Sequence, residues 1–87
     1  MDWKKYSFVI RSKIRQDIVK ALKTEKRPSD LKKELKKEDS NISRALTELL
    51  KAGIVVCLTP DETKGKFCKL SRAGSEIHNR ILQEKGE

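Results

Sequence analysis

The first quarter of the chain carries apolar residues four positions apart, which is the spacing of an amphipathic helix. This pattern predicts a helix over Tyr6–Leu22. Ser12 is a point at which the helix is either interrupted or properly begins, since serine favours the N-cap position. The predicted apolar stripe consists of Ile10, Ile14, Ile18 and Leu22.

A short second helix is predicted after Pro28, which ends any continuation of the preceding segment. Leu31 and Leu35 mark its apolar face, and it ends near Lys36. Ser29 is the expected N-cap residue. After a polar turn, this short helix leads into a longer one.

The third helix, predicted over Asp39–Ala52, has the clearest pattern in the chain, with apolar residues at i, i+3, i+4, i+7 and i+8. Gly53 follows where a left-handed glycine commonly ends a helix. The inward positions are Ile42, Ala45, Leu46, Leu49 and Leu50.

The last third of the chain predicts a β-hairpin and a fourth helix. Ile54–Thr59 is apolar and β-branched, residues 60–65 form a turn, and Lys66–Leu70 returns as a second strand. Ser71 is the expected cap of the final helix. The narrow apolar stripe of this helix consists of Ile77, Ile81 and Leu82.

This order, three helices, a hairpin and a helix, predicts a winged helix-turn-helix, a mainly α fold with a small β-hairpin of the α+β class. The 87 residues allow one domain over 1–87. We expect residues 12–70 to form its core, with 1–11 and 71–87 as elements for dimerisation.

The composition and charge favour some classes of function and exclude others. The chain has 21 Lys+Arg against 13 Asp+Glu, a net charge of +8, which favours a polyanionic partner such as nucleic acid. A surface that is charged only for solubility is the alternative. No apolar run approaches the ~20 residues of a membrane span and no signal peptide is evident, so we expect a cytoplasmic protein. The sequence contains no catalytic motif, so we expect neither an enzyme nor a cofactor.

Three segments carry a family resemblance that covers residues 8–82. They are Pro28–Leu35, Asn41–Leu46 and Leu49–Val55. Together they resemble the ArsR/MarR-like regulators, whose usual pattern is "(S/T)VSRAL..L...GLV" after a serine-containing helix. The first helix, the wing over residues 58–66 and the entry to the last helix at Leu70–Gly74 look like those of small archaeal members. The resemblance implies a homodimeric transcription regulator that binds double-stranded DNA.

The outward face of the third helix carries the candidate base contacts, because a recognition helix enters the major groove with its N-terminal half. Asparagine can bond adenine, arginine can bond guanine, and serine or threonine can bond either. The helix formers Glu, Lys and Ala would be more usual on a face that only meets water. The candidates are Ser40, Asn41, Ser43, Arg44 and Thr47.

Lysines beside this face are the candidate phosphate contacts, which position a protein without specifying sequence. Residues 20–37 carry eight Lys/Arg against three acids. The candidates near the second helix are Lys32, Lys33, Lys36 and Lys37, and those in the wing are Lys64, Lys66 and Lys69.

The terminal segments are the expected dimer interface. Three of the four aromatic residues lie within the first eight positions, and the stripe on the last helix is as narrow as a coiled-coil seam. Simple packing within one chain is the alternative. The expected interface residues are Trp3, Tyr6, Phe8, Ile77, Ile81 and Leu82.

The two cysteines lie one on each predicted strand. Cys57 and Cys68 face each other if paired residue numbers sum to 125, whereas a register slip of one would separate them. We expect two small buried apolar residues rather than a thiol sensor. The two cysteines and His78 are residue types that bind metals, but the metal-sensing CxC motif of the family is absent. We therefore expect no metal.

A second function also fits the fold, which does not by itself dictate function. A winged helix can serve as a protein- or RNA-interaction module without sequence-specific DNA binding. Glu38 and Asp39 at the start of the third helix favour this alternative, since acids there would face phosphate.

Overall fold

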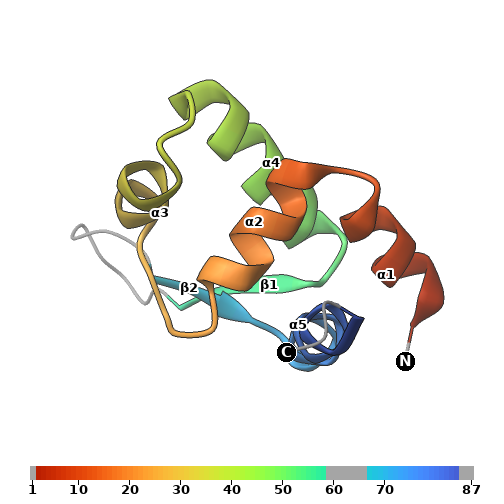
Figure 1. Ribbon diagram of the computed structural model, residues 1–87. Coiled ribbons are helices and arrows are strands. Elements are labelled where there is room, and N and C mark those ends of the chain that lie inside the picture. The colour runs from red at the N-terminus through yellow and green to blue at the C-terminus, as the bar shows by residue number, and fades with distance from the viewer. Residues whose placement is uncertain (1, 59–66, 85–87) are drawn as a thin grey trace.

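Five helices and one antiparallel hairpin make up residues 2–58 and 67–84, the part of the chain that the computed structural model describes. Figure 1 shows α2 at the centre of the molecule, and it packs against α1, α3, α4 and α5. The elements are α1 (Trp3–Ile10), α2 (Lys13–Ala21), α3 (Pro28–Leu35), α4 (Asp39–Lys51), β1 (Val55–Leu58), β2 (Phe67–Leu70) and α5 (Arg72–Glu84).

The expected first helix over Tyr6–Leu22 is divided into α1 and α2, so the prediction of one continuous helix is wrong and the alternative start at Ser12 is confirmed. Ser12 has an extended backbone, and its hydroxyl accepts a hydrogen bond from the Arg15 N–H at 3.4 Å. Asp2 caps α1 in the same way, which moves the start of this helix forward to Trp3.

The N-cap of α3 is Arg27 rather than Ser29, and Pro28 occupies the first helical position. The N–H of Arg27 donates to the Asp30 carboxylate at 3.2 Å, so the acid at the third helical position satisfies the N–H of the N-cap residue. The helix ends at Lys36, whose φ of 54° is left-handed although the residue is not glycine.

The core forms between α2, α4 and the elements that close over them. Ile18 and Val19 of α2 and Ile42 and Leu49 of α4 are all fully buried. Each such side chain contributes about 1.5–3 kcal/mol through burial. The predicted inward face of α4 is confirmed, with Leu50 half-buried at its edge.

The hairpin has the register in which paired numbers sum to 125, so Cys57 lies opposite Cys68 and the alternative register is wrong. Ile54 precedes β1 instead of belonging to it, and the expected strand residues Thr59 and Lys66 lie outside the described residues. A further backbone segment pairs with β2 from the other side: the N–H and carbonyl of Lys26 bond to the carbonyl and N–H of Cys68 at 3.0 and 2.7 Å. The sheet therefore gains a partner that the sequence pattern did not indicate.

Ser71 caps α5 as predicted, since its Oγ accepts from the Gly74 N–H at 3.2 Å. The same hydroxyl donates to the carbonyl of Gly53 at 2.6 Å, which ties the start of α5 to the end of α4. Gly53 itself has a φ of 78°, the left-handed conformation expected after a helix.

Close packing at Gly74 leads to a testable prediction. A Cβ at this position would collide with the backbone carbonyl of Ile54, so Gly74→Ala should destabilise the fold by about 1–3 kcal/mol. Ser75→Ala, one residue on and exposed, is the control and should change stability by less than about 0.5 kcal/mol. Urea unfolding followed by circular dichroism measures both, and equal midpoints would contradict the prediction.

Candidate nucleic-acid interface

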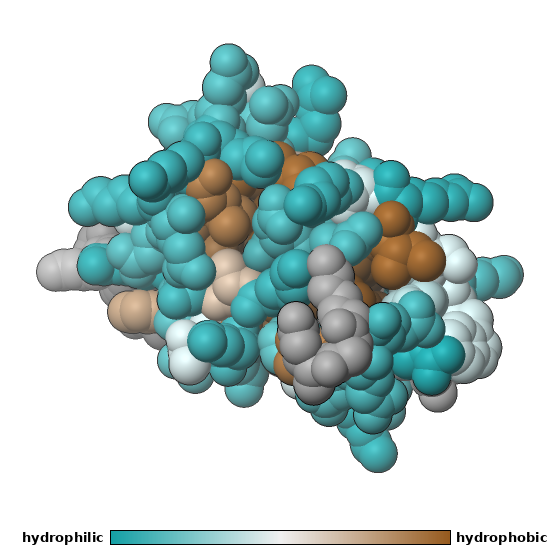
Figure 2. Space-filling model, viewed as in Figure 1, coloured by the Kyte–Doolittle hydropathy of each residue, from teal (hydrophilic) through white to brown (hydrophobic). Residues whose placement is uncertain are grey.

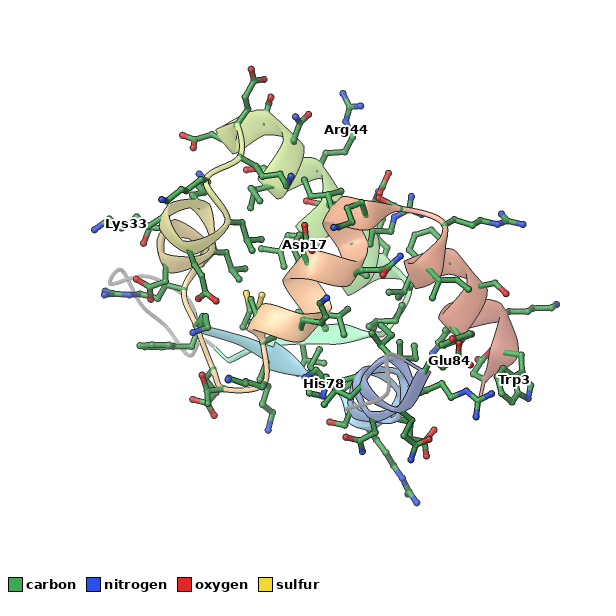
Figure 3. All side chains as sticks on the ribbon, in the orientation of Figure 1. Trp3, Asp17, Lys33, Arg44, His78 and Glu84 are labelled. Atoms are coloured by element: carbon green, nitrogen blue, oxygen red, sulfur yellow. The ribbon has the colours of Figure 1, made fainter. Side chains whose placement is uncertain are left out.

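Helix α4 presents a polar face to solvent, and most of this face belongs to its N-terminal half. Ser40, Ser43, Arg44 and Thr47 have the i, i+3, i+4, i+7 spacing of one helical stripe, and all four are exposed. Asn41 is also exposed and lies at the edge of the stripe. Figure 3 shows Arg44 pointing away from the body of the molecule. The five candidate base contacts thus share one accessible surface, which we call the α4 face.

The predicted phosphate-binding lysines before α4 lie on α3 and the connection that follows it, and Lys37 lines a groove together with Asn41 and Arg44. Lys33, Lys36 and Lys37 are exposed, and Lys33 points outward from α3 in Figure 3. Lys32 is half-buried, and its Nζ lies 3.8 Å from a carboxylate oxygen of Asp39. Lys69 is exposed on β2, whereas Lys64 and Lys66 lie outside the described residues.

Asp39, one of the two acids at the start of α4, is paired with Lys32. Asp39 is exposed and lies in the first turn, where the helix dipole favours a negative charge. Its pairing with Lys32 offsets part of the repulsion that it would exert on phosphate. Glu38, the N-cap residue, is exposed and makes no side-chain capping bond.

Arg15, which the sequence pattern did not single out, holds three helices together. Its Nε and Nη2 donate to Glu48 of α4 at 3.1 and 2.9 Å, and Nη1 donates to the backbone carbonyl of Phe8 at 2.8 Å. The guanidinium also lies 3.8 Å from the centre of the Phe8 ring. Because Glu48 is one turn after Arg44, this network sets the rotation of α4 and makes Arg15 a positioning residue for the α4 face.

A groove runs between the start of α2 and the α4 face. Lys13, Lys37 and Arg44 bring positive charge to its rim, and Asn41 lines it. Figure 2 shows hydrophilic side chains over most of this side of the molecule. The groove and the α4 face together form a polar, mainly basic surface suited to a polyanion.

The terminal helices do not present the expected dimer seam. Ile77 and Ile81 are 0% and 3% exposed, and Tyr6 is 9% exposed, because these side chains fill the core between α1, α2 and α5. Their assignment to an interface between chains is therefore corrected to packing within one chain. Leu82 and Phe8 are half-buried.

Trp3 is the one member of the predicted interface that stays largely exposed, at 56%. It lies edge-on to Tyr6 with ring centres 5.6 Å apart, and the Arg80 guanidinium lies 5.5 Å from its ring. Ile10, at the other end of α1, is 41% exposed. With the exposed Ser7 between them, they form a stripe at i, i+4 and i+7, which we call the α1 stripe.

Other kinds of site find no support in the described residues. No three His, Cys, Asp or Glu side chains within 2–58 and 67–84 gather into a group that could hold a metal ion. Over the same ranges, no helix is long and apolar enough to cross a membrane.

The helical pair α3–α4, the hairpin after it and the polar α4 face define a winged helix-turn-helix of the kind that transcription regulators use. The family model of the N-terminal domain of the methanogenesis regulatory protein FilR1 matches residues 3–84. The chain therefore belongs to this family of regulators. Comparison with curated protein sequences gives no match.

Solved structures of MarR-type regulators share the fold. The reduced form of MarR from E. coli is 25% identical, with a TM-score of 0.76 over 95% of this chain and 64% of MarR. The adhesin competence repressor AdcR from Streptococcus pyogenes is 13% identical, with a TM-score of 0.77 over 98% of this chain and 69% of AdcR. The chain thus spans about two thirds of these regulators. The predicted winged-helix, MarR-like fold is confirmed.

The plasmid segregation protein TubR, in a mutant form, has the same fold in a shorter chain. It is 12% identical, with a TM-score of 0.82 over 97% of this chain and 92% of TubR. At this identity the likeness concerns the fold alone.

Proposed function

We propose that this chain binds duplex DNA sequence-specifically as part of a transcription regulator, with α4 in the major groove. The observation that carries the proposal is the α4 face, where five polar side chains are exposed together on one helix, all but Thr47 in its N-terminal half. Recognition helices contact base edges with this end. Arg44 suits guanine, Asn41 suits adenine, and the hydroxyls suit either base edges or phosphate.

The lysines around the α4 face supply the part of the affinity that is independent of sequence. Lys33 and Lys36 are exposed on α3 and directly after it, and Lys13 and Lys37 line the groove next to the α4 face. Such contacts hold the register of the protein on the duplex, while base contacts select the site.

Salt dependence is the direct test of this proposal. If about five phosphates are neutralised per protomer, the logarithm of the binding constant should fall with the logarithm of salt concentration at a slope of about −4 to −5. Fluorescence anisotropy with a labelled duplex, from low to moderate salt, measures the slope. A slope near zero would reject DNA as the partner.

The alternative, a protein- or RNA-interaction module, rests on the acids at the start of α4. Glu38 and Asp39 are both exposed. The same titration with an RNA duplex of equal length distinguishes the two functions. Stronger binding to RNA than to every DNA tested would favour the alternative.

We further propose that the protein works as a homodimer through the α1 stripe, because a single α4 contacts only a few base pairs. A two-fold dimer would place two recognition helices about 34–36 Å apart on a palindromic site. Trp3 and Ile10 are large apolar side chains left exposed on α1, and Ile10 lines a groove together with Ile81 and Glu84 of α5. Residues 1–11 thus keep their proposed role in dimerisation, whereas the inner face of α5 belongs to the core.

Charge on the α1 stripe should separate dimerisation from folding. Trp3→Asp with Ile10→Asp is expected to convert a dimer into a folded monomer at micromolar concentration, because aspartate is poorly tolerated in a desolvated apolar contact. Sedimentation velocity measures the mass and circular dichroism the fold. Lys23→Asp, at an exposed position outside α1, is the control and should leave the dimer intact. A monomeric wild type that binds DNA at full affinity would contradict the dimer.

A further inference from the structure

The two cysteines of the hairpin lie in direct contact. Cys57 and Cys68 are opposite each other on β1 and β2, and their Sγ atoms are 3.6 Å apart. The two sulfur atoms are the yellow pair in Figure 3. Cys68 is fully buried, whereas Cys57 is half-buried and thus accessible to small molecules. The sequence favours two buried apolar residues, whereas the structure shows two thiols in contact, one of which is partly exposed.

The backbone around Cys68 fixes the kind of strand pair to which the two thiols belong. Both the N–H and the carbonyl of Cys68 bond to Lys26, on the side away from β1. In an antiparallel strand, the N–H and the carbonyl of one residue point to the same side. Because both groups of Cys68 point to Lys26, neither bonds to Cys57, and the two cysteines form a non-hydrogen-bonded pair. Such pairs have Cα atoms about 4.5 Å apart, within the range of about 4.4–6.8 Å that a disulfide spans.

We propose that Cys57 and Cys68 are a site of reversible intrachain disulfide formation by exchange with a low-molecular-weight disulfide. The Cys57 thiolate attacks one sulfur of the small disulfide, forms a mixed disulfide and releases one thiolate. The Cys68 thiol loses its proton and attacks the Cys57 sulfur, which releases the second thiolate. The protein thiols are oxidised by two electrons, and the small disulfide is reduced to two thiols.

The bond would link the two strands one residue pair away from the Leu58–Phe67 pair. The two residues are eleven positions apart, so the cross-link restricts a short loop in the unfolded chain. This restriction should raise the melting temperature of the oxidised protein by roughly 10 °C. The inference concerns the thiols alone and does not depend on the proposed binding to DNA.

Oxidised glutathione added to the folded protein tests the proposal. The wild type should lose the mass of two hydrogen atoms. Trypsin cuts after Lys64 and Lys66, between the two cysteines, so digestion without reductant should give a linked pair of peptides that separate on reduction. Cys68→Ala should instead hold one glutathione on Cys57. Cys57→Ala should remain unmodified, because only the buried thiol is left.

Three results would overturn the proposal. One is a wild type that keeps the mixed disulfide or stays reduced under these conditions. Another is a disulfide that joins two chains, visible as a dimer on a non-reducing gel. The third is an oxidised wild type that melts below the reduced one, since the bond would then form only by distorting the sheet.

Discussion

Replacing both Ile77 and Ile81 with aspartate is expected to abolish folding of this chain. Both side chains are almost completely buried, at 0% and 3% exposure, where α5 closes the core. Truncating one buried isoleucine to alanine already costs about 2–5 kcal/mol, and a carboxylate in its place adds a cost of desolvation. Two such losses exceed the ~5–15 kcal/mol that stabilises a typical domain. Circular dichroism and a one-dimensional proton spectrum should show an unfolded chain.

The matched control is Gln83→Asp, which adds the same group to the exposed side of the same helix. It should keep the native spectrum and melt within a few degrees of the wild type. If instead the double variant folds and only its mass in solution changes, the two isoleucines lie between chains and the core described above is wrong.

The misassignment of this helix has a physical cause. A stripe of Ile77, Ile81 and Leu82 indicates which side of the helix is buried. It does not indicate whether the same chain or a second chain buries that side. In the folded chain α5 packs on α1, α2 and β2, and these contacts bring together residues from both ends of the sequence. The stripe is narrow because only one side of α5 packs against the rest of this small domain.

Other elements were predictable because their signals are local. The inward face of α4, the left-handed Gly53 after it and the cap at Ser71 depend on residues within a few positions of one another. The strand pairing of Cys57 with Cys68 was one of two registers that the sequence allowed, and the structure selects it.

The features that escaped prediction depend on partners far apart in the chain. Arg15 bonds to Glu48, which is 33 positions away, and Lys26 pairs with Cys68 at the edge of β2 that faces away from β1. No periodicity marks such pairs, since each partner is an ordinary polar residue until the fold brings them together. The α4 face was predictable as a set of exposed side chains, whereas the groove beside it and the network that orients it required the structure.

Truncation of the α4 face is expected to remove sequence preference while leaving general affinity for DNA. Arg44→Ala or Asn41→Ala should weaken binding to the best site by about 1–3 kcal/mol, roughly 5- to 150-fold, because a bidentate contact to one base is lost. Both side chains are exposed and lie outside the core, so the variants should fold normally. Selection from genomic fragments identifies the best site, and competition with unrelated duplexes measures the preference.

Lys33→Ala is the matched control, because Lys33 is exposed on α3, the helix that precedes α4, and carries the same charge as Arg44. Loss of a phosphate contact should weaken all duplexes alike and make the salt slope shallower by about 1, with the order of preferred sites unchanged. The two variants therefore separate base contact from charge, since each removes one exposed positive charge from the helix pair α3–α4. If Arg44→Ala behaves as Lys33→Ala does, α4 contributes charge alone, and the helix that contacts the bases lies elsewhere in the protein.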